Sequence, residues 1–229
     1  AIASHRGVAG VQEAGAGLLV ELCGGTDDSG LARQKRAADE GAIAATVRML
    51  KDHPDSPGVQ DVGATLLALL CYGQDSTALT RQQSAVDDGV VLAVVTALMK
   101  HPNNVAVQES ATRALESVCS YVQGVDANSA DGEREASSPC SVLWRSSGSV
   151  AALKALSLKR MAVQQGAITA IVKTLLKHPS HSGVQDRAAR ALRNVCNDFG
   201  AHQQLAADAG AIPASVQSLK THIAYPQVV

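Results

Sequence analysis

Aromatic side chains are scarce in this chain: its 229 residues include three Tyr, one Trp and one Phe. A core built almost without rings must use Ala, Val and Leu, which suits closely packed helices better than a β-sandwich. Because 46% of the residues are hydrophobic, the chain is too apolar to be disordered, and it is long enough to fold without disulfides. The composition therefore favours an all-α protein.

Net charge, long apolar runs and paired cysteines are lacking as well. The 20 basic and 21 acidic side chains leave a net charge of −1, which argues against a general nucleic-acid or membrane-surface binder. The longest mostly apolar run, Val90–Met99, is half of what a membrane-spanning helix needs. The five cysteines form no Cys-x-x-Cys pair. These features predict a protein of the cytoplasm, or of the nucleus.

Sequence motifs of enzymes are not found either. The chain has no dinucleotide-binding GxGxxG, no phosphate-binding GxxxxGK[ST], no HExxH and no GxSxG. Acidic pairs such as Asp27-Asp28 and Asp87-Asp88 fall in polar connections, where a solvated surface explains them. We therefore predict a protein that is not an enzyme and that has no cofactor and no metal.

What the sequence does contain is an internal repeat. Four marks recur in one register: a Val-Gln pair beginning at Val11, Val59, Val107 and Val184; a His six residues before it (His5, His53, His101, His178); a Cys twelve residues after it (Cys23, Cys71, Cys119, Cys196); and a Gly (Gly41, Gly89, Gly166, Gly210) twelve residues before the next His. The His-to-His steps are 48, 48, 77 and 44. This register predicts a tandem repeat.

Each unit of the repeat reads as three helices. Apolar residues at offsets 0, 4, 7, 8 and 11 from Val107 predict one helix face, and the same offsets recur from Val184. A shorter helix is expected over Thr77–Val86, ended by Gly89, and an apolar one over Val90–Lys100. His101-Pro102 stops the latter, because proline cannot extend a helix. Such units bury their apolar faces only by stacking into a solenoid.

The pattern resembles the armadillo repeat family. The stretches that carry the resemblance are GAIAATVRMLKDHPDSPGVQDVGATLLALLC (41–71), GVVLAVVTALMKHPNNVAVQESATRALESVC (89–119) and GAITAIVKTLLKHPSHSGVQDRAARALRNVC (166–196). The resemblance implies an all-α, right-handed superhelix of about four three-helix repeats, with residues 1–229 as one solenoid. The register starts and ends inside units, which we interpret as a fragment of a longer array or as an array capped by partners.

The third step is longer than the two before it by 29 residues, which predicts an insertion over residues 123–149. Its Gly-, Ser- and Asp-rich start is typical of a surface loop. It contains Cys140, a candidate exposed thiol, and Trp144, the only Trp. Two interpretations stay open: a tolerated loop whose Trp144 packs on the solenoid, or a docking element with Trp144 as an interface anchor.

The periodic histidines and cysteines do not predict metal sites or disulfides. Equivalent positions on stacked helices lie about 8–10 Å apart, too far for two His to share a Zn²⁺ ion that binds nitrogen at about 2 Å. Cysteines on that spacing also cannot be bridged. We interpret the histidines as helix-end residues beside proline, and the cysteines as small core side chains.

The resemblance implies that the third helices line a concave groove for extended partner segments. Importin alpha lines this groove with ladders of Trp and, four residues later, Asn. The matching Trp-type positions here are Gly17, Thr65, Arg113 and Arg190, and the Asn-type positions are Glu21, Leu69, Ser117 and Asn194. Only Asn194 fits, so binding of nuclear-import cargo in this way is not expected.

A charge pattern instead suggests another ligand. Arg187, Arg190 and Asn194 share one face of the last third helix, with Arg113 adjacent in the preceding unit. Guanidinium groups there could bind carboxylates or phosphates of an acidic or phosphorylated protein segment. Solvated arginines, or pairs with Asp186 and Glu109, are the alternative. The predicted function is a protein-interaction scaffold or adaptor; the alternative is a structural subunit of a large assembly, contacting neighbours through side faces, insertion or open ends.

Overall fold

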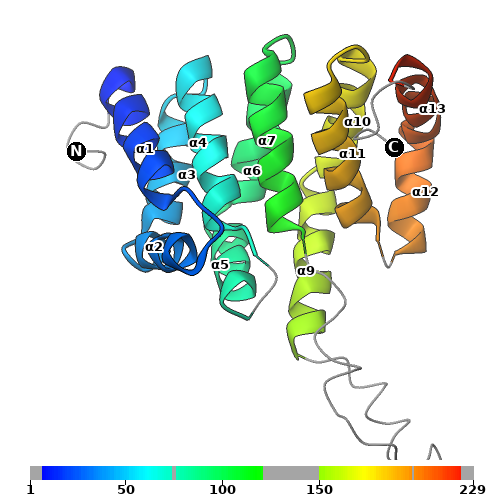
Figure 1. The fold of residues 1–229 in the computed structure, drawn as a ribbon. Helices are drawn as coiled ribbons and strands as arrows, with labels where there is room; N and C mark the ends of the chain where they lie inside the picture. Colours follow the sequence, from blue (N-terminus) through cyan, green and yellow to red (C-terminus); the bar gives the residue numbers. More distant parts are fainter. Residues whose placement is uncertain (1–6, 74–75, 121–149, 198, 223–229) are drawn as a thin grey trace, which may run out of the picture.

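The computed structural model describes residues 7–73, 76–120, 150–197 and 199–222 (Figure 1). This part of the chain contains twelve α-helices and no strand, which confirms the all-α prediction.

By position in the repeat, the first helices are α2 (Asp28–Asp39), α5 (Ser76–Asp87), α9 (Val150–Gln164) and α12 (Gly200–Asp208). The second helices are α3 (Ala42–Asp52), α6 (Val90–Lys100), α10 (Ala167–Lys177) and α13 (Ala211–Thr221). The third helices are α1 (Ala9–Cys23), α4 (Pro57–Leu70), α7 (Val105–Val118) and α11 (Ser182–Cys196). The insertion with Cys140 and Trp144 lies outside the described residues.

Helices of the same kind stack on one another along the molecule. The third helices form one row in the order α1, α4, α7 and α11, and the second helices form a row in the order α3, α6, α10 and α13 (Figure 1). This arrangement is consistent with an α-solenoid. None of the described helices combines the length and the hydrophobicity that crossing a bilayer requires.

The repeated glycine sets the corner between the first and second helices. Gly41, Gly89, Gly166 and Gly210 have φ values of 80°, 88°, 84° and 97°, in the left-handed region that favours glycine. A second helix begins directly after each of these glycines and ends directly before the repeated histidine. The predicted helix over Val90–Lys100 is confirmed by α6.

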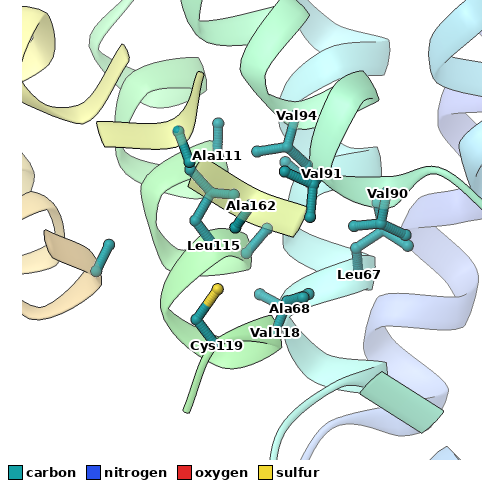
Figure 2. Close-up of a cluster of buried hydrophobic side chains, with 14 of the residues drawn as sticks. Leu67, Ala68, Val90, Val91, Val94, Ala111, Leu115, Val118, Cys119 and Ala162 are labelled. Carbon is teal, nitrogen blue, oxygen red and sulfur yellow. The ribbon is translucent and has the colours of Figure 1, made fainter. Parts of the chain in front are cut away.

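Small apolar side chains fill the space between the rows, as Figure 2 shows for the middle of the molecule. Ala111, Leu115 and Val118 of α7 are completely buried, which confirms the helix face predicted from their spacing. Cys23, Cys71 and Cys119 are buried free thiols, as the core interpretation predicts, and Cys196 is partly buried.

The thiols of Cys71 and Cys119 should be inert in the native protein. Desolvation by burial raises the pKa of each from 9.0 to about 12. Native stability should therefore be intact below pH 9 and fall as the pH rises from 9 toward 12, by up to about 1.4 kcal/mol per pH unit for each thiol. We expect urea unfolding between pH 8 and 10.5 to show a shallower decline in the Cys71→Ala/Cys119→Ala variant. Equal slopes in the two proteins would contradict the prediction.

A glycine of α4 is required for close packing. A Cβ on Gly63 would lie 2.6 Å from Leu50 Cδ2 and 2.8 Å from Met49 Cε. Gly63→Ala should lower the free energy of unfolding by about 1–3 kcal/mol through overpacking. Gly17→Ala, whose Cβ meets only Val62 at 4.0 Å, should instead raise it by up to about 1 kcal/mol through helix propensity. Chemical denaturation of both variants checks this, and a shift of the same sign in both would refute it.

The glutamine of the Val-Gln pair fastens each third helix to its own second helix. In the last three of these positions the glutamine is buried, and its side-chain N–H donates to two backbone carbonyls at the end of the second helix over 2.8–3.2 Å. The donors and acceptors are Gln60 to Leu50 and His53, Gln108 to Leu98 and His101, and Gln185 to Leu175 and His178. The amide thus satisfies carbonyls that have no partner within their helix.

The repeated histidines link successive units. The ring Nε2 lies 2.8 Å from the carbonyl of the proline in the preceding unit in three pairs: His101 with Pro54, His178 with Pro102 and His222 with Pro179. A carbonyl only accepts hydrogen bonds, so Nε2 carries the proton in each pair. The interpretation as helix-end residues beside proline is therefore incomplete, because these residues also join one unit to the next.

Candidate functional site

A cavity of about 520 Å³ runs beside the third helices α4, α7 and α11 and reaches the turn that follows α1. The lining residues are Gly25 and Thr26 after α1, Gln34 of α2, Ala68, Leu69, Tyr72 and Gly73 at the end of α4, Arg113, Glu116, Ser117 and Ser120 of and after α7, and Arg187, Arg190, Arg193 and Asn194 of α11. The structure thus brings together four of the five residues predicted from the sequence. The fifth, Trp144, lies outside the described residues.

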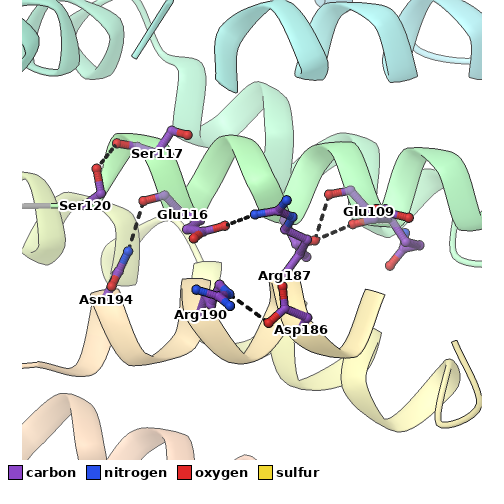
Figure 3. A network of polar contacts seen from close by, with 10 residues as sticks. Glu109, Glu116, Ser117, Ser120, Asp186, Arg187, Arg190 and Asn194 are labelled. Atoms are coloured by element: carbon purple, nitrogen blue, oxygen red, sulfur yellow. Dashed lines mark hydrogen bonds and ion pairs between the residues drawn. The ribbon is translucent and has the colours of Figure 1, made fainter. Parts of the chain in front are cut away.

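Two of the arginines are held by carboxylates. Arg187 Nη1 lies 3.2 Å from Glu116 Oε2, so this ion pair joins α11 to α7 (Figure 3). Arg190 Nε donates to Asp186 Oδ1 at 2.7 Å, one helical turn away, which raises the pKa of Arg190. The alternative prediction of a pair with Asp186 is correct for Arg190. Because both pairs are partly exposed, each contributes at most about 1 kcal/mol to stability.

Asn194 has a positioning role. Its side-chain Nδ2 donates to the backbone carbonyl of Glu116 over 3.1 Å (Figure 3). The residue predicted as a partner ligand therefore also fixes α11 against α7. Since Glu116 and Asn194 both line the cavity, this bond lies in the cavity wall, where α7 and α11 meet.

The other two arginines carry charge that the protein does not compensate locally. In the described ranges, Arg113 and Arg193 form no ion pair; Arg113 is half-buried and Arg193 is exposed. The carboxylate of Glu109, which the sequence offered as an alternative partner for an arginine, lies beside Gly183 at the start of α11 instead. The lining thus contains four arginines and one carboxylate, so the cavity is electropositive.

Helix carbonyls at this end of the row are covered by side-chain amides. Gln82 of α5 donates through Nε2 to the carbonyls of Cys71, Gly73 and Ser117 over 3.0–3.2 Å. Gln34 of α2 makes the corresponding bonds to Cys23 and Gly25, both at 3.1 Å. Helix C-termini carry partial negative charge that would oppose an anionic ligand. The amide groups of Gln34 and Gln82 offset this partial negative charge. The arginines therefore determine the sign of the electrostatic potential in the cavity.

Tyr72 and Arg193 were not among the site residues predicted from the sequence. Tyr72 is 50% exposed and lines both this cavity and a neighbouring one of about 450 Å³, which also contains Lys35 and Arg81. The two cavities share Thr26, Tyr72 and Gly73 and form one path, which we call the basic groove. The sequence did contain a signal for Tyr72, because it is an aromatic residue directly after a repeated Cys in a chain with few aromatic residues.

In comparisons with known proteins, no family model matches the chain, and no curated sequence or solved structure is significantly similar to it. Among the described residues, no group of three or more His, Cys, Asp or Glu side chains could hold a metal ion. The residues of the basic groove offer hydrogen-bond donors, positive charge and one aromatic ring. This combination is suited to binding an anionic chain segment.

Proposed function

We propose that the protein is an armadillo-type, right-handed superhelical scaffold or adaptor that binds an extended segment of a partner protein in the basic groove and catalyses no reaction. The observation that carries the proposal is one cavity that is lined by residues of the third helices α4, α7 and α11 and by the turn that follows α1. A segment that runs past these stacked helices must be extended, because it contacts one helix after another. We propose that it acts in a reducing compartment, the cytosol or nucleus, and the free thiols of the described cysteines support this.

The charge of the groove specifies the chemistry of the partner segment. Four arginines face one carboxylate, and Arg113 and Arg193 have uncompensated charge in the described part of the chain. Guanidinium groups bind carboxylates and phosphates through paired N–H donors. We therefore propose that the segment is acidic or phosphorylated, and that Tyr72 contacts its apolar part.

A peptide-binding experiment tests this function. Labelled peptides of equal length carrying glutamate, phosphoserine, lysine or no charge are titrated with the protein, and fluorescence anisotropy is followed. We expect the glutamate and phosphoserine peptides to bind, with affinity that falls as salt is added. The lysine and uncharged peptides should not bind.

The location of binding is tested with charge variants. Arg113→Glu/Arg190→Glu should abolish binding of the acidic peptides. The matched control, Arg48→Glu/Lys173→Glu, makes the same change in net charge at exposed positions of α3 and α10 outside the groove, and it should retain binding. Acidic peptides that bind both variants equally well would place the site elsewhere and overturn the proposal.

A further inference from the structure

The cations at the α2 and α5 end of the basic groove are engaged by the protein itself. Lys35 forms an ion pair with Asp39 of its own helix. Arg81 of α5 is 7% exposed, and it donates to the backbone carbonyls of Leu70 and Tyr72 over 2.7 and 3.0 Å. This end therefore offers a ligand little free positive charge. The end beside α7 and α11 differs, because two of its arginines form no ion pair in the described part of the chain.

The α2 and α5 end of the groove presents apolar surface instead. Tyr72 is 50% exposed and lines both cavities. Leu69, which lines the larger cavity, and Leu31, which lines the smaller one, are both half-buried. A partly exposed tyrosine beside leucines is typical of surfaces that bury an apolar side chain of a partner. The groove thus has an apolar end at Tyr72 and Leu69 and a cationic end at Arg113 and Arg193.

The stacking of the third helices fixes the separation of these two ends. The helices α4, α7 and α11 lie side by side in this order (Figure 1). Packed helices are about 8–10 Å apart, so Tyr72 after α4 and Arg193 of α11 are separated by about 16–20 Å across the row. Arg113 lies on the middle helix, at roughly half that distance across the row but about 10 Å away along the helix axis. An extended segment advances about 3.3 Å per residue, so about four to six residues span these separations.

We infer that the groove recognises a bipartite segment. A carboxylate or phosphate binds at Arg113 and Arg193, and a large apolar residue about four to six positions away packs on Tyr72 and Leu69. The inference rests on the proposed function, because it assigns the specificity of the same groove. The arginines select the charge of the segment, and Tyr72 and Leu69 select its apolar residue. A segment that is only acidic would occupy the cationic end and leave the apolar end in contact with water.

Phosphoserine peptides of equal length test the inference. Each carries one phenylalanine two, five or ten positions from the phosphoserine, on either side of it, and the parent peptide has serine in place of the phenylalanine. In fluorescence anisotropy, we expect the spacing of five, in at least one of the two orders, to bind about 10-fold more tightly than the parent. The other spacings should bind like the parent.

The outcomes of this series separate the inference from the proposed function. Equal binding of all the phosphoserine peptides would overturn the inference and leave the proposed function standing. Tightest binding at a spacing of two or ten would overturn the inference as well. If none of the peptides bound, both the inference and the proposed function would be wrong.

Variants of Tyr72 locate the apolar contact. In Tyr72→Ala, the gain from the phenylalanine should fall from about 10-fold to less than about 2-fold, because the ring on which it packs is removed. Tyr72→Phe keeps the ring and should keep the gain. The matched control, Leu92→Ala, removes an exposed apolar side chain of α6 outside the groove and should keep it too.

The Tyr72→Ala variant is expected to fold. The side chain is half exposed, and the bond from Arg81 uses the backbone carbonyl of residue 72, which the substitution leaves in place. Circular dichroism checks this. A gain from the phenylalanine that stayed about 10-fold in folded Tyr72→Ala would show that its contact lies elsewhere and would overturn the inference.

Discussion

Replacing Gln108 with alanine should lower the free energy of unfolding by about 2–4 kcal/mol. The side chain is buried, and its Nε2 donates to the carbonyls of Leu98 and His101 at 2.9 and 3.2 Å. Its Oε1 accepts from the hydroxyl of Thr174 at 2.6 Å, which belongs to α10 of the next unit. Alanine would leave these groups without that partner and would create a cavity between two units.

Two further variants separate the contributions to this loss. Gln108→Met keeps nearly the same volume but donates no hydrogen bond, so we expect it to retain more than half of the destabilisation. Gln83→Ala removes a partly exposed glutamine of α5 whose side chain bonds only Asp87 among the described residues, and it should change stability by less than about 0.5 kcal/mol. Urea unfolding followed by circular dichroism measures all three. If Gln108→Ala were as stable as Gln83→Ala, the fastening role of the glutamine would be wrong.

Reversing the two uncompensated arginines should have the largest effect on binding. Arg113→Glu/Arg193→Glu is expected to weaken binding of a phosphorylated peptide about 100-fold or more, since each reversal costs at least about 1.4 kcal/mol in the groove. Isothermal titration calorimetry at low and moderate salt measures the change. The difference between the variant and the original protein should shrink as salt is added.

A variant with the opposite expected sign guards against general damage to the groove. Glu116→Gln removes the only carboxylate among the lining residues of the larger cavity and frees Arg187, so it should tighten binding of the same peptide several-fold. The bond from Asn194 is unaffected because it uses the backbone carbonyl of residue 116. Weaker binding in both variants would count against an electrostatic role of these residues.

Local features of the fold could be read from the sequence. Glycine conformation and proline stops act on their own helix, so Gly89 and Pro102 correctly mark the ends of α6. Apolar periodicity likewise gave the buried face of α7. The links between units could not be read in the same way. The bond from His178 to Pro102 joins residues 76 positions apart, and it exists only because the second helices stack with their ends aligned.

The same distinction applies to the site. Arg187, Arg190 and Asn194 were found because they share one face of a single helix, and Arg113 was found because it occupies the corresponding position one unit earlier. Tyr72 was missed because its place in the groove depends on how the chain turns after α4, where Gly73 has a φ of 124°. The pairing of Arg187 with Glu116 depends on the lateral alignment of α7 with α11, which sequence spacing does not contain.

The histidine–proline link bears on how such an array can grow. Donor and acceptor are neighbours in the sequence: His101 binds the unit before it, while the carbonyl of Pro102 receives the unit after it. A duplicated unit therefore arrives with both halves of its own connection, and a deleted unit removes both. The 77-residue step leaves the link intact at 2.8 Å, as does the 48-residue step. Gene duplication, or the design of proteins from consensus repeats, could therefore lengthen the row by whole units. The existing histidine–proline hydrogen bond would connect each added unit, and no new kind of contact would be needed.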